Sequence, residues 1–177
     1  TPQFFEMLNG LPDRVGDEFP QFDGDVRAAW RAWITRGWFE WESDGYPYWS
    51  HLHHMKTWWE FRHLPNIRLV HYADLLKDLE GQMRDLAKWL GVTVREERWP
   101  HIVSACTFEN MRREAEVHGE MMKMSWKDGA RTFFNKGTNG RWRDVLAADD
   151  LALYDAAVHK TLPRDCARWL ENGGAIG

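Results

Sequence analysis

The segment FFNKGTNGRWRDVL, residues 133–146, brings together residue types that suit an anion site. Its glycines let the backbone turn sharply and present N–H groups, and its lysine adds a mobile positive charge. Its arginines add planar guanidinium donors, and its two phenylalanines can cover a flat base. The residues concerned are Phe133, Phe134, Lys136, Gly137, Gly140, Arg141 and Arg143. From spacing alone, a phosphate site and a tight loop with a solvated lysine fit this pattern about equally well.

A histidine cluster, HLHH at residues 51–54, is a second group with ligand chemistry. His51 and His54 would share one face of a helix, which invites a zinc interpretation. The cluster lacks a fourth ligand at fitting spacing, so the sequence predicts no metal site. We expect these histidines to edge a pocket together with neighbouring tryptophans.

Composition limits the classes of function. The chain has 177 residues, enough for one domain with a core, and a formal charge of -4. This acidic balance, with scattered basic residues, disfavours nucleic-acid binding. No apolar run approaches the ~20 residues that cross a bilayer, and no secretory signal pattern opens the sequence. The two cysteines lack metal-ligand spacing and fit a reducing compartment, so we expect a cytoplasmic protein.

The elements that must position these residues begin with IRLVHY, residues 67–72, the one convincing strand of the sequence. Its nearly continuous apolar character is typical of a strand buried on both faces of a parallel sheet. Asp74 then acts as a predicted helix cap, and apolar residues recur at helical spacing until Gly91 ends the helix. A strand followed by a helix is half of a βαβ unit, which predicts an α/β fold with partner strands outside this sequence.

Caps, periodicity and helix breakers predict further helices. They run from Asp25 to Gly37, from about Trp49 to Arg62, from a capping box at Thr93 and Glu96 with a kink or restart at Pro100, from near Thr107, from an Asp149 cap to Lys160, and from Pro163 to Gly173. Residues 1–24 are expected to form an entry loop, and residues 115–128 either a mobile loop over a site or a disordered segment. The chain is therefore predicted to be dominated by helices.

Four segments, in order, resemble the cytosolic-type sulfotransferases, enzymes that use 3′-phosphoadenosine 5′-phosphosulfate (PAPS). The glycine segment is similar to the family's KGxxGxW element, and VHYADLLKDLEGQMRDLAKWLG, residues 70–91, to its strand-YEDL-helix segment. WWE at residues 58–60 lies the expected short distance before that segment, and CTFENM at residues 106–111 resembles the family's TSFxxM segment. The resemblance implies a P-loop-type parallel-sheet scaffold seen incompletely, as one sulfotransferase domain over residues 1–177.

The resemblance also implies a role for each matching position. The residues carried over to the adenine and ribose side of the nucleotide are Tyr72, Cys106, Thr107, Phe108 and Met111, with Phe108 as the stacking ring. Those carried over to the 3′-phosphate are Phe133, Phe134, Asn135, Lys136 and Gly137. Those carried over to an apolar acceptor pocket are His54, Trp38 and Trp41, although tryptophans in this stripe are core residues by default.

The sequence departs from the family pattern at several positions. Asn135 replaces an arginine that many members have, and Cys106 replaces the threonine of TSF. Arg141 replaces an aspartate, as in a bacterial-type variant, and RDVLAADD does not match the dimerisation signature of the animal enzymes. The family's first strand, its phosphate loop, its histidine base and the arginine and serine that hold the 3′-phosphate have no counterpart here. The catalytic residues are therefore expected upstream of Thr1, and the sequence is interpreted as the C-terminal two-thirds of such an enzyme.

The resemblance implies a sulfotransferase that moves a sulfuryl group from PAPS to a hydroxyl of a small or lipid-like acceptor, leaving 3′-phosphoadenosine 5′-phosphate (PAP). The alternative is a non-catalytic fragment or regulatory module that keeps a nucleotide- or protein-binding surface. The two hypotheses differ in one observable, which is donor-dependent transfer.

Overall fold

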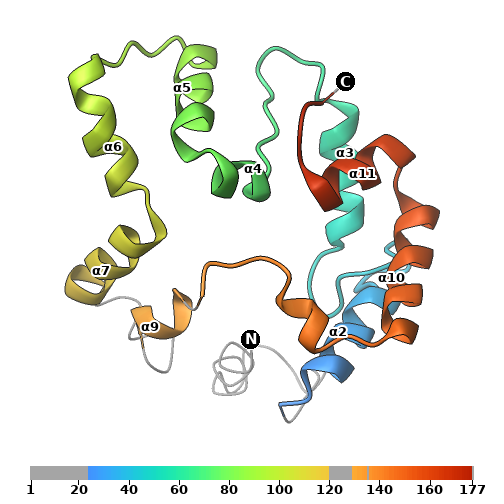
Figure 1. The fold of residues 1–177 in the computed structure, drawn as a ribbon. Coiled ribbons are helices and arrows are strands. Elements are labelled where there is room, and N and C mark those ends of the chain that lie inside the picture. Colours follow the sequence, from blue (N-terminus) through green and yellow to red (C-terminus); the bar gives the residue numbers. More distant parts are fainter. Residues whose placement is uncertain (1–23, 120–128, 135, 177) are drawn as a thin grey trace. The chain divides into compact units, whose positions relative to one another are not determined.

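The computed structural model describes residues 24–119, 129–134 and 136–176, and every regular element within these ranges is helical (Figure 1). The chain divides into two compact units. Within the described ranges, the first unit holds residues 24–71 and 140–176, and the second holds residues 72–139. The single domain expected from the chain length stays a prediction.

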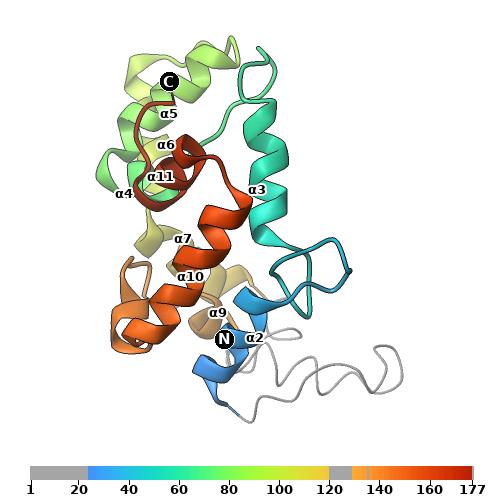
Figure 2. The same ribbon diagram turned by 90° about the vertical axis from the view of Figure 1, so that its right-hand side faces the viewer.

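The first unit is built from helices that come from both ends of the described chain. They are α2 (Val26–Thr35), α3 (His51–Glu60), the 3-10 turn η2 (Arg141–Asp144), α10 (Ala148–Thr161) and α11 (Arg164–Asn172). Helix α10 packs against α2, α3 and α11 (Figure 2). The core between α3, α10 and α11 consists of Leu52, Met55, Trp59, Val158, Leu162, Cys166 and Trp169. These residues recur at helical spacing, so each helix buries one face.

Polar side chains fix where α2 and α3 begin. The Asp25 carboxylate accepts a hydrogen bond from the Ala28 N–H at 2.9 Å and so caps α2, the helix predicted to run from Asp25. At α3 the Ser50 hydroxyl caps the His53 N–H, and the fully buried Asp44 accepts from the N–H groups of His51 at 3.0 Å and Leu52 at 3.1 Å. Asp44 therefore compensates the unpaired donors and the positive end of α3.

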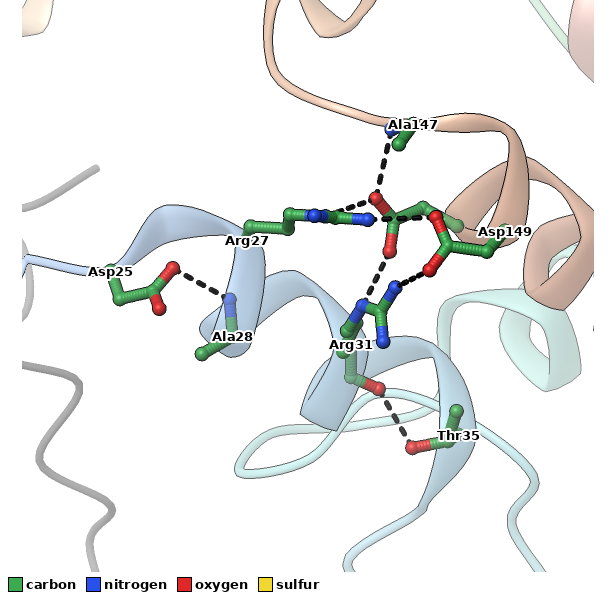
Figure 3. A network of polar contacts seen from close by, with 8 residues as sticks. Asp25, Arg27, Ala28, Arg31, Thr35, Ala147 and Asp149 are labelled. Carbon is green, nitrogen blue, oxygen red and sulfur yellow. Dashed lines mark hydrogen bonds and ion pairs between the residues drawn. The ribbon is translucent and has the colours of Figure 1, made fainter.

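An ion-pair network joins α2 to α10 (Figure 3). Arg27 contacts Asp150 at 2.5 Å and Asp149 at 2.7 Å, and Arg31 contacts Asp150 at 2.5 Å and also pairs with Asp149. Burial raises the pKa of the Asp150 carboxyl, but the Ala147 N–H and both guanidinium groups outweigh that effect and hold its pKa at about 2. The prediction that Asp149 caps this helix is wrong. Asp150 accepts the Ala147 N–H at 2.9 Å instead, and Asp149 points toward the arginines.

The second unit is a succession of shorter helices: α4 (Tyr72–Lys77), α5 (Leu79–Trp89), the 3-10 turn η1 (Glu96–Arg98), α6 (Trp99–Ala105), α7 (Phe108–His118) and α9 (Ala130–Phe133). Asp78 caps α5 through the Gly81 N–H at 2.9 Å, so the predicted Asp74 cap is wrong and Asp74 lies in the first turn of α4. The capping box predicted from Thr93 is also not formed, because η1 begins after Arg95. Pro100 lies in the first turn of α6, which confirms the predicted restart.

The predicted strand at residues 67–72 is not formed. Residues 67–71 have no regular secondary structure, and Tyr72 already belongs to α4. Exposure alternates along the segment, with Leu69 packed on the first core and Val70 42% exposed, so it is not buried on both faces. A strand is held by hydrogen bonds to a neighbouring strand, and the described part of the chain offers none. The parallel sheet stays a prediction.

Three other predictions concern loops, a binding residue and a membrane span. The entry loop up to residue 23, residues 120–128 of the predicted mobile loop, and Asn135 lie outside the described residues. Residues 115–118 belong to α7, so the helix continues further than predicted. None of the helices that the structure describes has the length and apolarity needed to cross a bilayer.

Candidate functional site

The aromatic residues of the glycine segment gather against the start of α7. The rings of Phe133 and Phe134 lie 5.0 Å apart, and those of Phe134 and Phe108 lie 5.9 Å apart, both pairs nearly perpendicular. Edge-to-face pairs of this kind fix the position of each ring more firmly than apolar contact alone. Three residues predicted to hold a nucleotide therefore form one aromatic cluster within the second unit.

Gly137 packs its backbone directly on the Phe108 ring. Its φ angle is +63°, in the left-handed region, and a Cβ atom at this position would lie 2.7 Å from a ring carbon of Phe108. The Tyr72 hydroxyl donates a hydrogen bond to the Gly137 carbonyl at 3.4 Å. Only glycine meets both the backbone angle and the close approach. The structure thus brings together Tyr72, Phe108 and Gly137, which lie far apart in the sequence.

A hollow of about 500 Å³ lies beside this contact. It is lined by Phe108, Glu109, Arg112, Arg113, Glu116 and Lys136, and we call it the α7 hollow. Its volume is in the range of small-ligand sites. Three cationic and two anionic side chains line it, so its fixed charge is +1. An apolar ring beside an excess of positive charge suits a planar group that carries a phosphate.

Three of these lining residues lie outside the segments singled out in the sequence: Arg112, Arg113 and Glu116. A signal was present, because Arg112 follows Phe108 by four residues on a helix and shares its face. The position of α7 beside Lys136 requires the folded chain, since Lys136 lies 23 positions after Arg113 in the sequence.

The remaining residues predicted on the adenine side have local structural contacts. The Thr107 hydroxyl accepts from the Asn110 N–H at 3.3 Å and donates to the Ser104 carbonyl at 2.9 Å, so it caps α7. Cys106 is exposed at the end of α6, and Met111 is 40% exposed. These three residues flank the α7 hollow in sequence, but they are not part of its lining.

The two arginines of the glycine segment lie in η2 of the first unit. The Arg143 guanidinium covers the Trp142 ring at 4.8 Å, a cation–π contact. The predicted anion segment is thus divided, with Lys136 and Gly137 in the second unit and Arg141 and Arg143 in the first.

The predicted acceptor residues, also in the first unit, have different ring partners. Trp38 stacks on Tyr46 at 5.8 Å, and Trp41 stacks on Phe39 at 5.7 Å. The ring of His54 meets Trp58 edge-on at 6.2 Å. Trp38 and Trp41 are 40% and 63% exposed, so the expectation that they belong to the core is wrong for these two rings. Among the residues that the structure describes, no three metal-ligand side chains cluster.

Comparison with known proteins identifies the family of this chain. A family model for the sulfotransferase domain matches residues 34–165. A glycolipid sulfotransferase of Mycobacterium bovis (strain BCG / Pasteur 1173P2) is 32% identical over 123 residues, 69% of this chain and 37% of that protein. Sulfotransferase 1A1 of Rattus norvegicus is 27% identical over 120 residues, 67% of this chain and 41% of that protein.

A solved structure agrees at the level of the fold. The crystal structure of mouse sulfotransferase SULT7A1 complexed with PAP superposes with a TM-score of 0.66 at 19% identity, covering 84% of this chain and 52% of that one. The chain spans about two fifths of the length of the curated relatives named above. Since the family match covers most of the sequence, this chain belongs to the sulfotransferase domain family.

Proposed function

We propose that this chain provides nucleotide-binding residues of a sulfotransferase, which transfers a sulfuryl group from PAPS to a hydroxyl of a small or lipid-like acceptor. The observation that carries the proposal is the contact of Gly137 with the Phe108 ring, beside a hollow that Lys136 also lines. This contact unites the two segments that resemble the family's nucleotide-binding elements.

In this proposal the second unit binds and orients the nucleotide. Phe108 offers a ring face for the adenine, and the Tyr72 hydroxyl holds the Gly137 carbonyl. The Lys136 ammonium and the backbone N–H groups around Gly137 bind the 3′-phosphate by charge-assisted hydrogen bonds. PAPS supplies the activated sulfuryl group, and transfer also requires a base for the acceptor hydroxyl and positive charge at the bridging oxygen.

The proposed class of acceptor is supported by a relative of this chain and by exposed aromatic side chains. The relative named above from Mycobacterium bovis is a glycolipid sulfotransferase, which supports a lipid-like acceptor. Trp41, stacked on Phe39, and Trp38 are exposed aromatic surfaces that suit the apolar part of such a molecule. The cytoplasmic location expected from composition stays part of the proposal.

The test is calorimetric titration of the 177-residue chain with PAP at low salt. Saturable binding is expected, and Lys136→Ala is expected to weaken it at least tenfold, since hydrogen bonds to charged groups contribute about 1.5–3 kcal/mol. Lys88→Ala is the matched control, because it removes the same charge from the last turn of α5. Absence of PAP binding, or equal losses in both variants, would refute the nucleotide assignment. Donor-dependent transfer is the observable that separates a sulfotransferase from the regulatory-module alternative.

A further inference from the structure

We infer that Arg112 of α7 is a second phosphate-binding residue, which Glu116 holds beside the site until the nucleotide arrives. The inference rests on the proposed function and adds a residue to it. The reason to look for a second cation is the charge of the ligand, because a phosphate monoester carries between one and two negative charges near neutral pH. The segment FFNKG, residues 133–137, supplies only one cation, Lys136.

Helix α7 supplies the missing positive charge to the same hollow. Arg112 and Arg113 both line it together with Lys136. Arg112 lies one helical turn beyond Phe108, so its guanidinium belongs to the face that carries the proposed adenine ring. Arg113 instead donates to the Asn110 side chain and pairs with Glu114 at 3.9 Å. Neither of those partners lines the hollow, so Arg112 is the better oriented of the two arginines.

The contacts of Arg112 allow an exchange of partners. Its Nε lies 3.5 Å from Glu116 Oε1, and the Nε of Arg131 in α9 lies 3.8 Å from the same oxygen. Both separations are long for ion pairs, and the side chains are partly exposed, so each pair is weak. When Arg112 turns to a phosphate, Glu116 keeps Arg131 as a cation. Glu116 is then not left unpaired, which favours the exchange.

This arrangement predicts effects of opposite sign from two neighbouring residues. Arg112→Ala removes a phosphate donor and is expected to weaken PAP binding roughly tenfold. Glu116→Gln removes the competing carboxylate and is expected to tighten PAP binding about two- to fivefold, the range of an exposed ion pair. The double variant should bind like Arg112→Ala, because Glu116 acts only through Arg112.

The experiment is calorimetric titration of the whole chain and these variants with PAP and, separately, with adenosine 5′-phosphate, which lacks the 3′-phosphate. Arg112→Ala should leave the affinity for adenosine 5′-phosphate unchanged. Arg95→Ala is the matched control, because Arg95 is an exposed arginine of the same unit outside the hollow. Circular dichroism of each variant reports whether the helices persist.

Four results would overturn the inference. Unchanged PAP affinity in Arg112→Ala, with loss in Lys136→Ala, would remove Arg112 from the site and leave the proposed function intact. Equal losses for both nucleotides would show that Arg112 does not act on the 3′-phosphate, and weaker PAP binding by Glu116→Gln would disprove the exchange. If the unaltered chain bound no PAP, the proposed function itself would fail and the inference with it.

Discussion

The contact between Gly137 and Phe108 allows a prediction of stability loss that can be compared with the loss at a second glycine, Gly91. Replacing Gly137 by alanine forces a side chain into the left-handed region at φ +63°, which costs about 1–2 kcal/mol. The new Cβ would also lie 2.7 Å from the Phe108 ring, where ordinary contact begins at 3.4 Å. Moving a packed ring by this difference, 3.4 - 2.7 = 0.7 Å, costs a further ~1–3 kcal/mol. The total expected for Gly137→Ala is therefore about 2–5 kcal/mol.

Gly91 provides the reference for the backbone part of this cost. Its φ angle is +69°, and no atom lies within 4 Å of the place where its Cβ would be. Gly91→Ala should therefore lose only the ~1–2 kcal/mol of the backbone angle. The assay is the free energy of unfolding in urea, measured for both variants and repeated with Phe108→Ala as background. In that background the ring is gone, so the two glycine substitutions should cost the same.

Equal losses for Gly137→Ala and Gly91→Ala in the chain that retains Phe108 would refute the reasoning. That result would mean that the glycine segment does not rest on α7 in solution. The same variants also test function, because displacing the segment should weaken PAP binding. Each 1.4 kcal/mol of binding free energy that is lost corresponds to a tenfold loss in PAP affinity.

The other predictions concern the Asp150 network and the two cysteines. The pKa of Asp150, about 2 against an ordinary 3.8, is depressed, so its contribution to stability is complete above pH ~4 and is lost as the pH falls toward 2. Asp150→Asn should lower the thermal midpoint at neutral pH and flatten the fall of that midpoint between about pH 4 and pH 2. Asp155 is an exposed carboxylate on the same helix, and Asp155→Asn should leave the acid profile unchanged. Parallel acid profiles for Asp150→Asn and the unaltered chain would contradict this prediction. Cys106 is exposed, while Cys166 is fully buried and burial raises the pKa of its thiol to about 11. A thiol reagent such as Ellman's should therefore modify one cysteine quickly and the second only after denaturant is added, and rapid reaction of Cys166 in the native chain would show that the first core is open.

Sequence patterns determined most helices of this protein, because caps and periodicity are local properties. Asp25 before an apolar stripe predicted α2, and Thr107 predicted the start of α7, where its hydroxyl accepts the Asn110 N–H. The family resemblance also predicted that Phe108, Lys136 and Gly137 belong to one nucleotide site. Those predictions needed only the order and type of residues along the chain.

Where a cap has competitors, the folded chain decided which carboxylate is used. Asp78 rather than Asp74 caps α5, and Asp150 rather than Asp149 accepts the Ala147 N–H at the start of α10. Asp149 is instead directed toward the arginines of α2, more than a hundred residues away in sequence. The segment at residues 67–71 shows the same dependence, because strand propensity forms no strand without a partner.

Tertiary structure alone decided what surrounds the candidate site. Arg112 and Glu116 carry no motif, and they became site residues only because α7 lies beside Lys136 in the folded chain. The close approach of the Phe108 ring to Gly137 likewise depends on the packing of segments nearly thirty residues apart. The sequence by itself determined which groups have the chemistry expected of a nucleotide site, since that is a matter of residue type. Their convergence on one hollow is a matter of distance, which only the packed chain sets.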